Sequence, residues 1–293
     1  MGKFAAPDRQ AAAVMRRLQG TVLRSVGTVR NYEQALTRLA EHAQAERIEG
    51  GLRGMSAEQV IAYLEQRGEV VGQKTLDMER QAAQVMLQHV TGQLPPGARL
   101  PVVKSEHQQV LIGRAYTAAQ VERIAAAQTE RNALATQIAH AAGLRAHELL
   151  TLRPATERHA DDRPASEQKF SARDGIRYTV VGKGGLCREV LVPLALVERL
   201  EARRLDAPQT VTDRGVRYEQ HYDLAGGHRW SASFSAAAER ALGWSSGAHG
   251  VRHSYAQERM NELQRRLPRD EALRVVSQEL GHFRPEITEV YLR

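Results

Sequence analysis

The residues best suited to chemistry lie close together near the end of the sequence. His249 and Arg252 belong to the run HGVR, His282 belongs to the run LGH, and Tyr291 follows His282 by nine residues. A protonated tyrosine, with a pKa of about 10, is a weak nucleophile. It attacks a phosphate only where a base and cations surround it. These side chains therefore supply the parts of a phosphoryl-transfer site that needs no metal ion.

Two further cations stand earlier in the chain. Arg145 lies in the run GLRAHELL at residues 143–150, and Lys183 lies in VGKGG at residues 181–185. A lone H-x-x-R or G-K-G occurs by chance in many chains, so each motif by itself is weak. The complete set, in this order and at these spacings, is a strong and specific pattern.

The ordered set resembles the signature of the tyrosine recombinase (phage integrase) family. That signature has an arginine in GLR-x-x-E-L, a lysine on a β-hairpin, an H-x-x-R pair, an L-G-H and a tyrosine nine residues later. Thr288 also stands where the family usually has a threonine. The match covers residues 116–293, and the N-terminal third matches only in its general helical character. The resemblance implies a DNA strand transferase that needs no metal, no ATP and no cofactor.

The resemblance also implies roles for the main residues. Tyr291 would attack the scissile phosphate of DNA, form a 3′-phosphotyrosyl intermediate and expel the 5′-hydroxyl. Arg145 and Arg252 would stabilise charge on the non-bridging oxygens, because fixed guanidinium groups need no reorganisation in the transition state. Lys183 would protonate the leaving oxygen, since glycines around it let the backbone approach DNA closely.

Supporting roles are implied for further residues. His249 and His282 would assist proton transfer and hydrogen-bond the phosphate, which suits side chains that titrate near neutral pH. Glu148, three residues after the first arginine, is expected either to orient that arginine or to form an exposed salt bridge. Arg188 and Arg284 are expected to contact DNA phosphates.

Each of these assignments has a competing structural interpretation. Tyr291 taken alone could simply pack a terminal helix, and Tyr255 is the nearest rival tyrosine but reads as a core residue. His249 and His253 have the i, i+4 spacing of metal ligands, but no acidic partner completes a set and Arg252 between them would repel a cation. The glycine-rich run at 181–185 lacks the spacing of a nucleotide-binding P-loop. We therefore expect no metal site.

Composition narrows the class of protein. The chain has 293 residues, 42% of them hydrophobic, which is enough for two globular domains. No apolar run approaches the roughly 20 residues that span a bilayer. Residues 1–8 have no signal-peptide core, and the single Cys187 allows neither an internal disulfide nor a thiolate zinc site. We therefore expect a cytoplasmic, nucleoid-associated protein without membrane contact.

Charge favours a polyanionic partner. The net charge is +7, and only five of the 41 lysines and arginines are lysines. Arginine binds phosphate oxygens in a bidentate manner, although genomic base composition explains most of its excess. After Lys104 the only lysines are Lys169 and Lys183, so the lysine of the catalytic set has almost no rival.

Hydrophobic periodicity predicts a mainly α protein with a small β-hairpin or sheet, an α+β fold. We expect a helical core-binding, DNA-binding domain at residues 1–92, a linker at 93–114 and a catalytic domain at 115–293. Ser56 and Thr117 each begin a capping box. The polar stretch 155–173 has no assigned role. Within the catalytic domain we expect strands at 177–181 and 188–192, and helices at 117–128, 132–142, 146–152, 195–205, 232–241, 253–265 and 270–280.

The sequence thus predicts a site-specific recombinase that integrates or excises a mobile element. Resolution of chromosome or plasmid dimers by a Xer-like recombinase is the first alternative. A type IB-like topoisomerase and a catalytically inactive DNA-binding accessory protein are the others. The expected partners are double-stranded DNA attachment sites, a homotetramer on paired sites and an accessory DNA-bending or directionality factor. Many family members continue past the tyrosine into a tail that docks on a neighbouring protomer, whereas only Leu292 and Arg293 follow Tyr291; how protomers couple is therefore left open.

Overall fold

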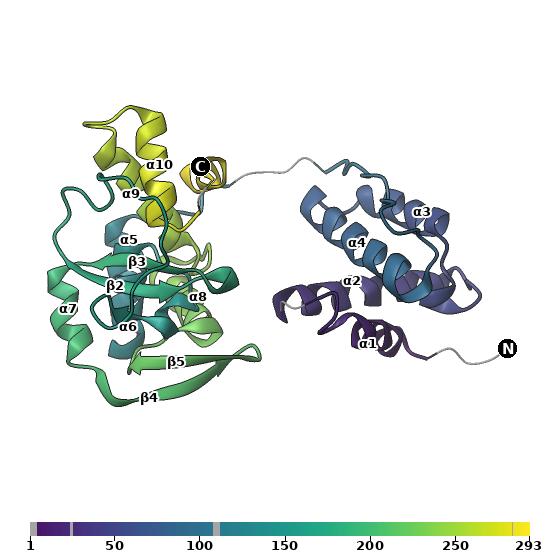
Figure 1. Ribbon diagram of the computed structural model, residues 1–293, viewed down its shortest axis with the longest axis horizontal. Coiled ribbons are helices and arrows are strands. Elements are labelled where there is room, and N and C mark those ends of the chain that lie inside the picture. The colour runs from purple at the N-terminus through teal and green to yellow at the C-terminus, as the bar shows by residue number, and fades with distance from the viewer. Residues whose placement is uncertain (1–4, 24–25, 108–111, 283) are drawn as a thin grey trace. The chain divides into compact units, whose positions relative to one another are not determined.

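The computed structural model describes residues 5–23, 26–107, 112–282 and 284–293. The chain divides into two compact units, Met1–Val110 and Leu111–Arg293. Figure 1 shows the first in purple to blue and the second in teal to yellow. Each unit has its own hydrophobic core, as their sizes allow. The predicted fold class, mainly α with small antiparallel sheets, is confirmed.

The N-terminal unit is helical. It contains α1 (Pro7–Leu18), α2 (Val26–Ala45), a 3₁₀ turn (Gly51–Gly54), α3 (Ala57–Gly68), α4 (Gln73–Met86) and a π turn (Leu87–Thr91). The expected capping box at Ser56 is present, because its hydroxyl accepts from the backbone of Gln59 while the Gln59 side chain accepts from the backbone of Ser56. Apolar faces of α1, α2 and α4 pack together around fully buried Leu18 and Leu36.

Residues that follow the π turn also pack on this unit. Leu94 and Leu100 are buried in the N-terminal core, and the backbone of Leu100 donates to Gln84. Further along, Ser105 donates to the carbonyl of Val71. Much of the segment 93–114 that we expected to link the domains is therefore packed on the helices before it. Residues 108–111 of that segment lie outside the described residues.

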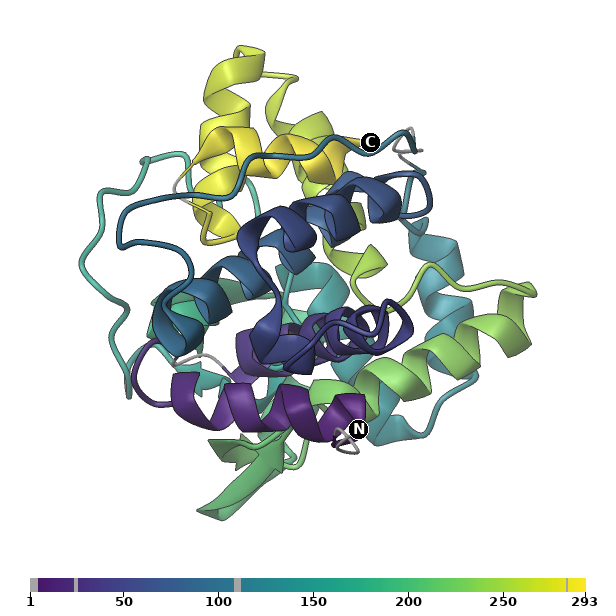
Figure 2. The same ribbon diagram turned by 90° about the vertical axis from the view of Figure 1, so that its right-hand side faces the viewer.

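The C-terminal unit is built from helices around two small sheets. Antiparallel β1 (Arg153–Pro154), β2 (Ile176–Val181) and β3 (Cys187–Val192) form one sheet in the order β1-β2-β3. The other sheet pairs β4 (Arg204–Asp213) with β5 (Val216–Tyr222). The helices are α5 (Ala118–Ala126), α6 (Glu130–Ala142), α7 (Leu194–Glu201), α8 (Gly227–Leu242), α9 (Gly250–Leu263), α10 (Arg269–Glu279) and α11 (Pro285–Glu289). Figure 2 shows the light green α8 beside the teal α5, with which it packs.

Most of the predicted elements of this unit are present with small shifts at their ends. The hairpin β2–β3 is present, and Thr117 forms the expected capping box at α5. The helix expected at 146–152 is wrong, because only a 3₁₀ turn, η3 (Glu148–Thr151), forms before β1. Pro154 disfavours the α conformation for Arg153, so no helix continues past this turn. The helix expected at 195–205 ends at Glu201, and the β4–β5 hairpin that follows was not predicted.

Residues of α6, α8 and α9 share one hydrophobic core. Trp230 and Phe234 on α8 are buried against Ile138 of α6 and Val251 of α9. A smaller apolar cluster joins α9 to α10, with Tyr291 and Leu292 packed on its edge. Figure 1 accordingly shows the C-terminal end beside α9 and α10. In the part of the chain that the structure describes, no helix is long and apolar enough to cross a membrane.

Candidate active site

Tyr291 lies in a cluster of three histidine rings. It belongs to the terminal 3₁₀ turn η5 (Val290–Leu292), and its ring centroid is 4.6 Å from that of His253, 5.0 Å from His282 and 5.4 Å from His249. Its hydroxyl is 3.2 Å from Nε2 of His249. The structure therefore places the predicted nucleophile within hydrogen-bonding distance of a predicted proton acceptor.

Gln257 fixes the backbone of this segment. Its side-chain amide on α9 donates to the carbonyl oxygen of Tyr291 at 3.2 Å and to an oxygen of Arg293 at 3.0 Å. The segment is thereby attached to the helix that also begins with the H-x-x-R motif. His249 at the N-cap of α9, His253 within it and Tyr291 consequently share one support.

The arginine of that motif is completely buried. Arg252 donates to the carbonyl oxygens of Gly143 and Leu280, and its Nη2 is 3.0 Å from Nε2 of His282. Gly143 ends α6 with φ of 62°, and a Cβ there would lie 2.7 Å from the ring of Tyr255. Burial lowers the pKa of Arg252 to about 9, and the nearby carboxylate of Glu148 opposes that decrease. The guanidinium therefore remains charged at neutral pH.

Glu148 joins the arginines of the site. Its carboxylate accepts from Nη1 of Arg145 at 2.8 Å, from the backbone N–H of Arg145 at 2.8 Å and from Nη2 of Arg188 at 2.8 Å. Nη1 of Arg252 is 3.8 Å away. The side chain of Glu148 is 0% exposed, which excludes the exposed salt bridge that the sequence left open.

The charge of Glu148 is held by these arginines. Burial alone raises the pKa of a carboxyl group, but Arg188, Arg252 and Arg145 hold the pKa of Glu148 below its usual value. The side chain of Arg145 stays 23% exposed, so one arginine of the group reaches the surface while Glu148 fixes its position. This arrangement orients Arg145 in the way that a phosphate-binding arginine requires.

Arg188 has partners other than the DNA phosphate that we predicted for it. Its side chain is 4% exposed, and its two Nη atoms donate to Glu148 and to the carbonyl oxygen of Glu279 at 2.6 Å. Arg188 therefore links β3 to the end of α10, where the LGH run begins. It helps to hold Glu148 rather than facing solvent.

His282 is held from both sides of its ring. Nε2 faces Arg252, which can only donate, so that nitrogen is the acceptor and Nδ1 carries the proton. Nδ1 is 3.1 Å from Oγ1 of Thr288, which is 0% exposed. Burial, followed by the charges of Arg252, Arg145 and Arg188, lowers the pKa of His282 to about 3. The imidazole is therefore neutral at physiological pH, with a single tautomer.

His249 is also neutral. Burial, with the charges of Arg252 and others nearby, lowers its pKa to about 3. A neutral imidazole near the phenol can accept the proton that Tyr291 must lose. His253 has a pKa lowered to about 4, chiefly by burial, and packs on the tyrosine ring.

Two predicted residues are not brought into the buried cluster. Lys183 lies in the turn between β2 and β3, and its side chain is exposed. The turn nevertheless begins beside the site, because a Cβ on Gly182 would lie 3.2 Å from Oε1 of Glu148 and 3.8 Å from Nη1 of Arg145. Arg284 immediately precedes α11, and its side chain is exposed. Among the described residues, its side chain makes no hydrogen bond or ion pair with the other predicted site residues.

The structure bears on two rival interpretations, Tyr255 as the nucleophile and a metal site at His249 and His253. Tyr255 is 2% exposed and donates to the buried carboxylate of Glu279, so it is a core residue as expected. The rings of His249 and His253 have centroids 5.6 Å apart. Among the residues that the structure describes, no three His, Cys, Asp or Glu side chains lie together in a way that could hold a metal ion.

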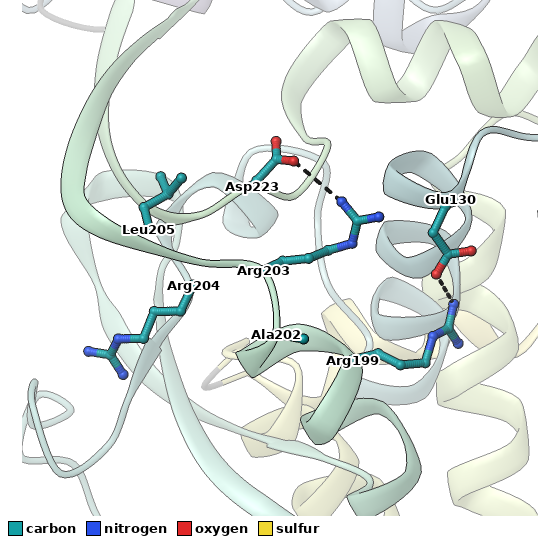
Figure 3. A pocket seen from close by; sticks show the side chains of 7 residues that line it. All are labelled: Glu130, Arg199, Ala202, Arg203, Arg204, Leu205 and Asp223. Carbon is teal, nitrogen blue, oxygen red and sulfur yellow. Dashed lines mark hydrogen bonds and ion pairs between the residues drawn. The ribbon is translucent and has the colours of Figure 1, made fainter.

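A separate hollow on this unit contains arginines that are already paired. It measures about 540 Å³ and lies between α7, the start of β4 and the start of α6. Figure 3 shows the ion pairs Arg199–Glu130 and Arg203–Asp223 beside it. Arg204 pairs with Glu157. Since its arginines have acidic partners and its lining has no nucleophile, we do not regard this hollow as the phosphoryl-transfer site.

Comparison with known proteins gives structural matches only. No protein-family model matches the chain, and no curated protein matches it in sequence. The structure of XerH site-specific recombinase bound to difH substrate is similar with a TM-score of 0.55 at 15% identity, covering 98% of this chain and 91% of that chain. A lambda integrase (75–356) dimer bound to a COC′ core site has a TM-score of 0.56 at 16% identity, covering 96% and 93%.

A third match supports the same fold. The Tn1549 transposon integrase in complex with transposon right-end DNA has a TM-score of 0.55 at 13% identity, covering 99% of this chain and 95% of that one. At such identities the likeness concerns the fold, and the chain has the fold of tyrosine recombinases across nearly its whole length. The resemblance inferred from the sequence is confirmed at that level.

Proposed function

We propose that this protein, which has the fold of tyrosine recombinases, is a site-specific DNA recombinase that cuts and rejoins strands through a 3′-phosphotyrosyl intermediate. The observation that carries the proposal is the 3.2 Å separation between the hydroxyl of Tyr291 and Nε2 of neutral His249. A phenol next to a neutral imidazole, with arginines around them, is a nucleophile with its base and its charge stabilisers.

The chemistry follows from these positions. The Tyr291 oxygen attacks the scissile phosphorus, its proton passes to His249, and the bond from phosphorus to the 5′-oxygen breaks. Lys183, at the hairpin turn that begins beside Arg145, donates a proton to the leaving oxygen. Rejoining reverses these steps with a different 5′-hydroxyl, so the phosphodiester energy is conserved and no ATP is needed.

The arginines stabilise the charge that develops in the transition state. Arg145 is bonded to Glu148 and is partly exposed at the surface. The charged guanidinium of Arg252 lies over the ring of Tyr291, with its carbon 5.7 Å from the ring centroid. Nε of Arg252 is buried and has no hydrogen-bond partner among the described residues. An unsatisfied buried donor favours an acceptor such as a phosphate oxygen, which a small shift of Tyr291 would admit.

The N-terminal unit is proposed as a second DNA-binding domain. Its buried Glu79, 2% exposed, accepts from Nε of Arg38 at 2.8 Å and from Arg67 at 3.0 Å. These arginines remain 41% and 24% exposed, so the carboxylate fixes cations at the surface. Together with the net charge of +7, this supports binding of duplex DNA with a strong dependence on salt. We propose in addition that the protein assembles as a homotetramer on paired attachment sites. Its proposed role is the integration or excision of a mobile element in the cytoplasm.

The proposal is tested by trapping the covalent intermediate. The full-length protein and a Tyr291→Phe variant are incubated in EDTA with nicked duplexes that carry sequence from beside the protein's own gene. We expect a covalent protein–DNA band on a denaturing gel for the wild type and none for the variant. A band that persists in the variant would identify a different nucleophile.

The same assay separates the related functions. Cleavage that depends on one sequence supports a recombinase, whereas cleavage of any duplex with relaxation of supercoils by a monomer supports a topoisomerase. DNA binding without a band on any duplex supports a non-catalytic DNA-binding protein. Rejoining between two attachment sites in the same or different molecules distinguishes dimer resolution from integration.

A further inference from the structure

A short segment at the start of the C-terminal unit runs along both parts of the tyrosine site. We call residues 113–116 the strap. The backbone N–H of Tyr116 donates to Oγ of Ser254 on α9 at 2.8 Å, and the hydroxyl of Tyr116 accepts from the backbone of Ser246 at 2.7 Å. The ring of Tyr116 is stacked on Trp244 at 5.2 Å. The strap is therefore firmly attached to the beginning of α9.

The strap approaches the start of α9 more closely than a side chain at Gly250 would allow. A Cβ on Gly250, the first residue of α9, would lie 2.3 Å from the carbonyl oxygen of Arg114. A Cβ on Gly113 would lie 3.4 Å from an oxygen of Arg293, two residues beyond Tyr291. The strap thus contacts both the helix that begins after His249 and the segment that carries the nucleophile.

The side chain of Arg114 is fixed beside His249 while remaining exposed. Its Nε and Nη2 donate to the carbonyl oxygen of Ser246 at 3.3 and 2.8 Å, in the loop just before His249. A guanidinium has five N–H donors, and Nη1 of Arg114 has no hydrogen-bond partner among the described residues. Its charge also contributes, after burial, to the lowered pKa of His253, and it is one of several cations that lower the pKa of His249.

We propose that Arg114 is a further phosphate-binding residue of the phosphoryl-transfer site, contacting the DNA backbone where it passes His249. This inference rests on the proposed function and adds a cation that belongs to none of the sequence motifs. An arginine that is held by one carbonyl and still presents free donors is preorganised for a phosphate oxygen. Arg252 uses both of its Nη atoms on protein atoms, so a partly free guanidinium at the edge extends the charge available to DNA.

The alternative is that Arg114 merely braces the loop before His249. A brace would act through its hydrogen bonds to Ser246 and would leave the salt dependence of DNA binding unchanged. The two roles differ in the salt dependence of DNA binding, because only a phosphate contact releases counterions from DNA. In either role the positive charge of Arg114 disfavours the protonated form of His249. The groups that act on His249 include Arg252 and His253 on α9, Arg145 before η3, Tyr291 on η5 and Arg114 on the strap. The hollow that His249 lines is also lined by His147, Asp213, Arg214 and His228.

Without Arg114, one repulsion of the imidazolium is lost and the pKa of His249 rises. Cleavage that uses neutral His249 as the base then loses activity at a higher pH than in the wild type. Substitution of Arg114 by lysine keeps the charge, so the acidic limb of the profile should stay near its wild-type position.

The experiment measures single-turnover cleavage by the full-length protein between pH 3 and 9, a range that includes the pKa of His249 of about 3, on the nicked duplex that gives the wild-type covalent band. The variants are Arg114→Gln, Arg114→Lys and the control Arg240→Gln. Arg240 is exposed and donates to the carbonyl oxygen of Ala127 at 2.7 Å, so its loss also removes one charge and one arginine–carbonyl bond. DNA affinity is measured against salt concentration in parallel.

We expect Arg114→Gln to slow cleavage about 10- to 100-fold, as for loss of a hydrogen bond to a charged group. The acidic limb should shift to higher pH and the salt slope of binding should fall by about one. Arg114→Lys should retain most of the activity, and Arg240→Gln should cleave like the wild type. A wild-type cleavage rate or a wild-type salt slope of binding in Arg114→Gln would overturn the inference, as would equal losses in the glutamine and lysine variants. Absence of any covalent band with the wild-type protein would instead refute the proposed function.

Discussion

Nδ1 of His282 lies 3.1 Å from the buried hydroxyl of Thr288, six residues further along the chain. That contact fixes the ring so that its other nitrogen accepts from Arg252. The sequence indicated only that Thr288 stands where the resembled family usually has a threonine. Its buried hydroxyl oxygen is the acceptor that keeps the proton on Nδ1 and leaves Nε2 unprotonated.

Replacement of Thr288 by valine should therefore impair cleavage with little change in DNA affinity. Valine preserves shape but removes the acceptor, so His282 loses its orientation and the cleavage rate should fall about fivefold to tenfold, as expected for one hydrogen bond. Single-turnover cleavage and binding by the full-length protein measure the two effects. Thr288→Ser retains the hydroxyl and serves as the control; equal rates for the valine and serine variants would show that the contact has no role in the reaction.

Glu148 should be essential for stability as well as for the position of Arg145. It is the shared partner of Arg145 and Arg188, with Arg252 nearby. Glu148→Gln leaves these buried cations without their counter-charge, and breaking a buried ion pair typically costs about 3–5 kcal/mol. We expect a reduced free energy of unfolding in urea at pH 7. Glu122→Gln, which changes an exposed glutamate, is the control.

The contribution of Glu148 also has a defined pH dependence. Its pKa in the folded protein is lower than in the unfolded chain, so the stabilisation is complete above the unfolded pKa of about 4.3 and is lost as the pH falls through the folded value. The stability difference between the wild type and Glu148→Gln should therefore shrink when the pH is lowered below about 4.3. A difference that is constant down to pH 3 would contradict this assignment.

The proposed catalytic set was accessible from the sequence because the proposed chemistry restricts residue types and their spacing. Tyr291, His282, Arg252 and His249 form one cluster in the structure, and β2–β3 places Lys183 at its turn. The capping boxes were accessible for the same reason, since a helix start satisfies its backbone N–H groups through a few specific side chains.

Residues without a local motif could not be found in this way. Arg114 is one arginine among many, and only the fold brings it beside His249. Arg188 was expected to face DNA, but its partner Glu148 lies on another element, which periodicity along β3 does not reveal. The β4–β5 hairpin was missed because its strands are largely exposed and lack the alternating burial that identifies a strand. Its turn at Arg214 and Gly215, both with positive φ, was the available signal.

The histidine cluster should make the folded protein sensitive to mild acid. The pKa values of His249 and His282 are lowered to about 3 and that of His253 to about 4, all chiefly by burial. The unfolded chain therefore binds more protons than the folded protein once the pH falls below about 6.5. Stability should decrease as the pH falls from about 6.5 towards these values.

Urea unfolding at pH 7.5 and at pH 5.5 measures this effect, and histidine titration by NMR reports the pKa values directly. His249→Asn removes one of the three titrations and should show a smaller loss of stability between the two pH values. Imidazole resonances of the cluster that titrate near pH 6.5 in the folded protein would show that the rings are not held neutral.

Lys183 should act on the leaving oxygen and not on DNA binding. Its side chain is exposed at the turn that begins beside Arg145, so loss of its amine leaves the buried cluster intact. We expect Lys183→Ala to cleave an ordinary phosphodiester about 100-fold or more slowly, as for loss of a general acid. The same variant should cleave a 5′-bridging phosphorothioate at nearly the wild-type rate, because a thiolate leaves without protonation.

The matched control for this prediction is Lys169→Ala. Lys169 is the other lysine of this unit, and its ammonium group lies 3.6 Å from Glu189, outside the tyrosine cluster. It should cleave both substrates at wild-type rates. If Lys183→Ala is equally slow on oxygen and sulfur leaving groups, the lysine stabilises phosphate charge and another group donates the proton. Arg145, whose guanidinium is next to the turn, would then be the next residue to test.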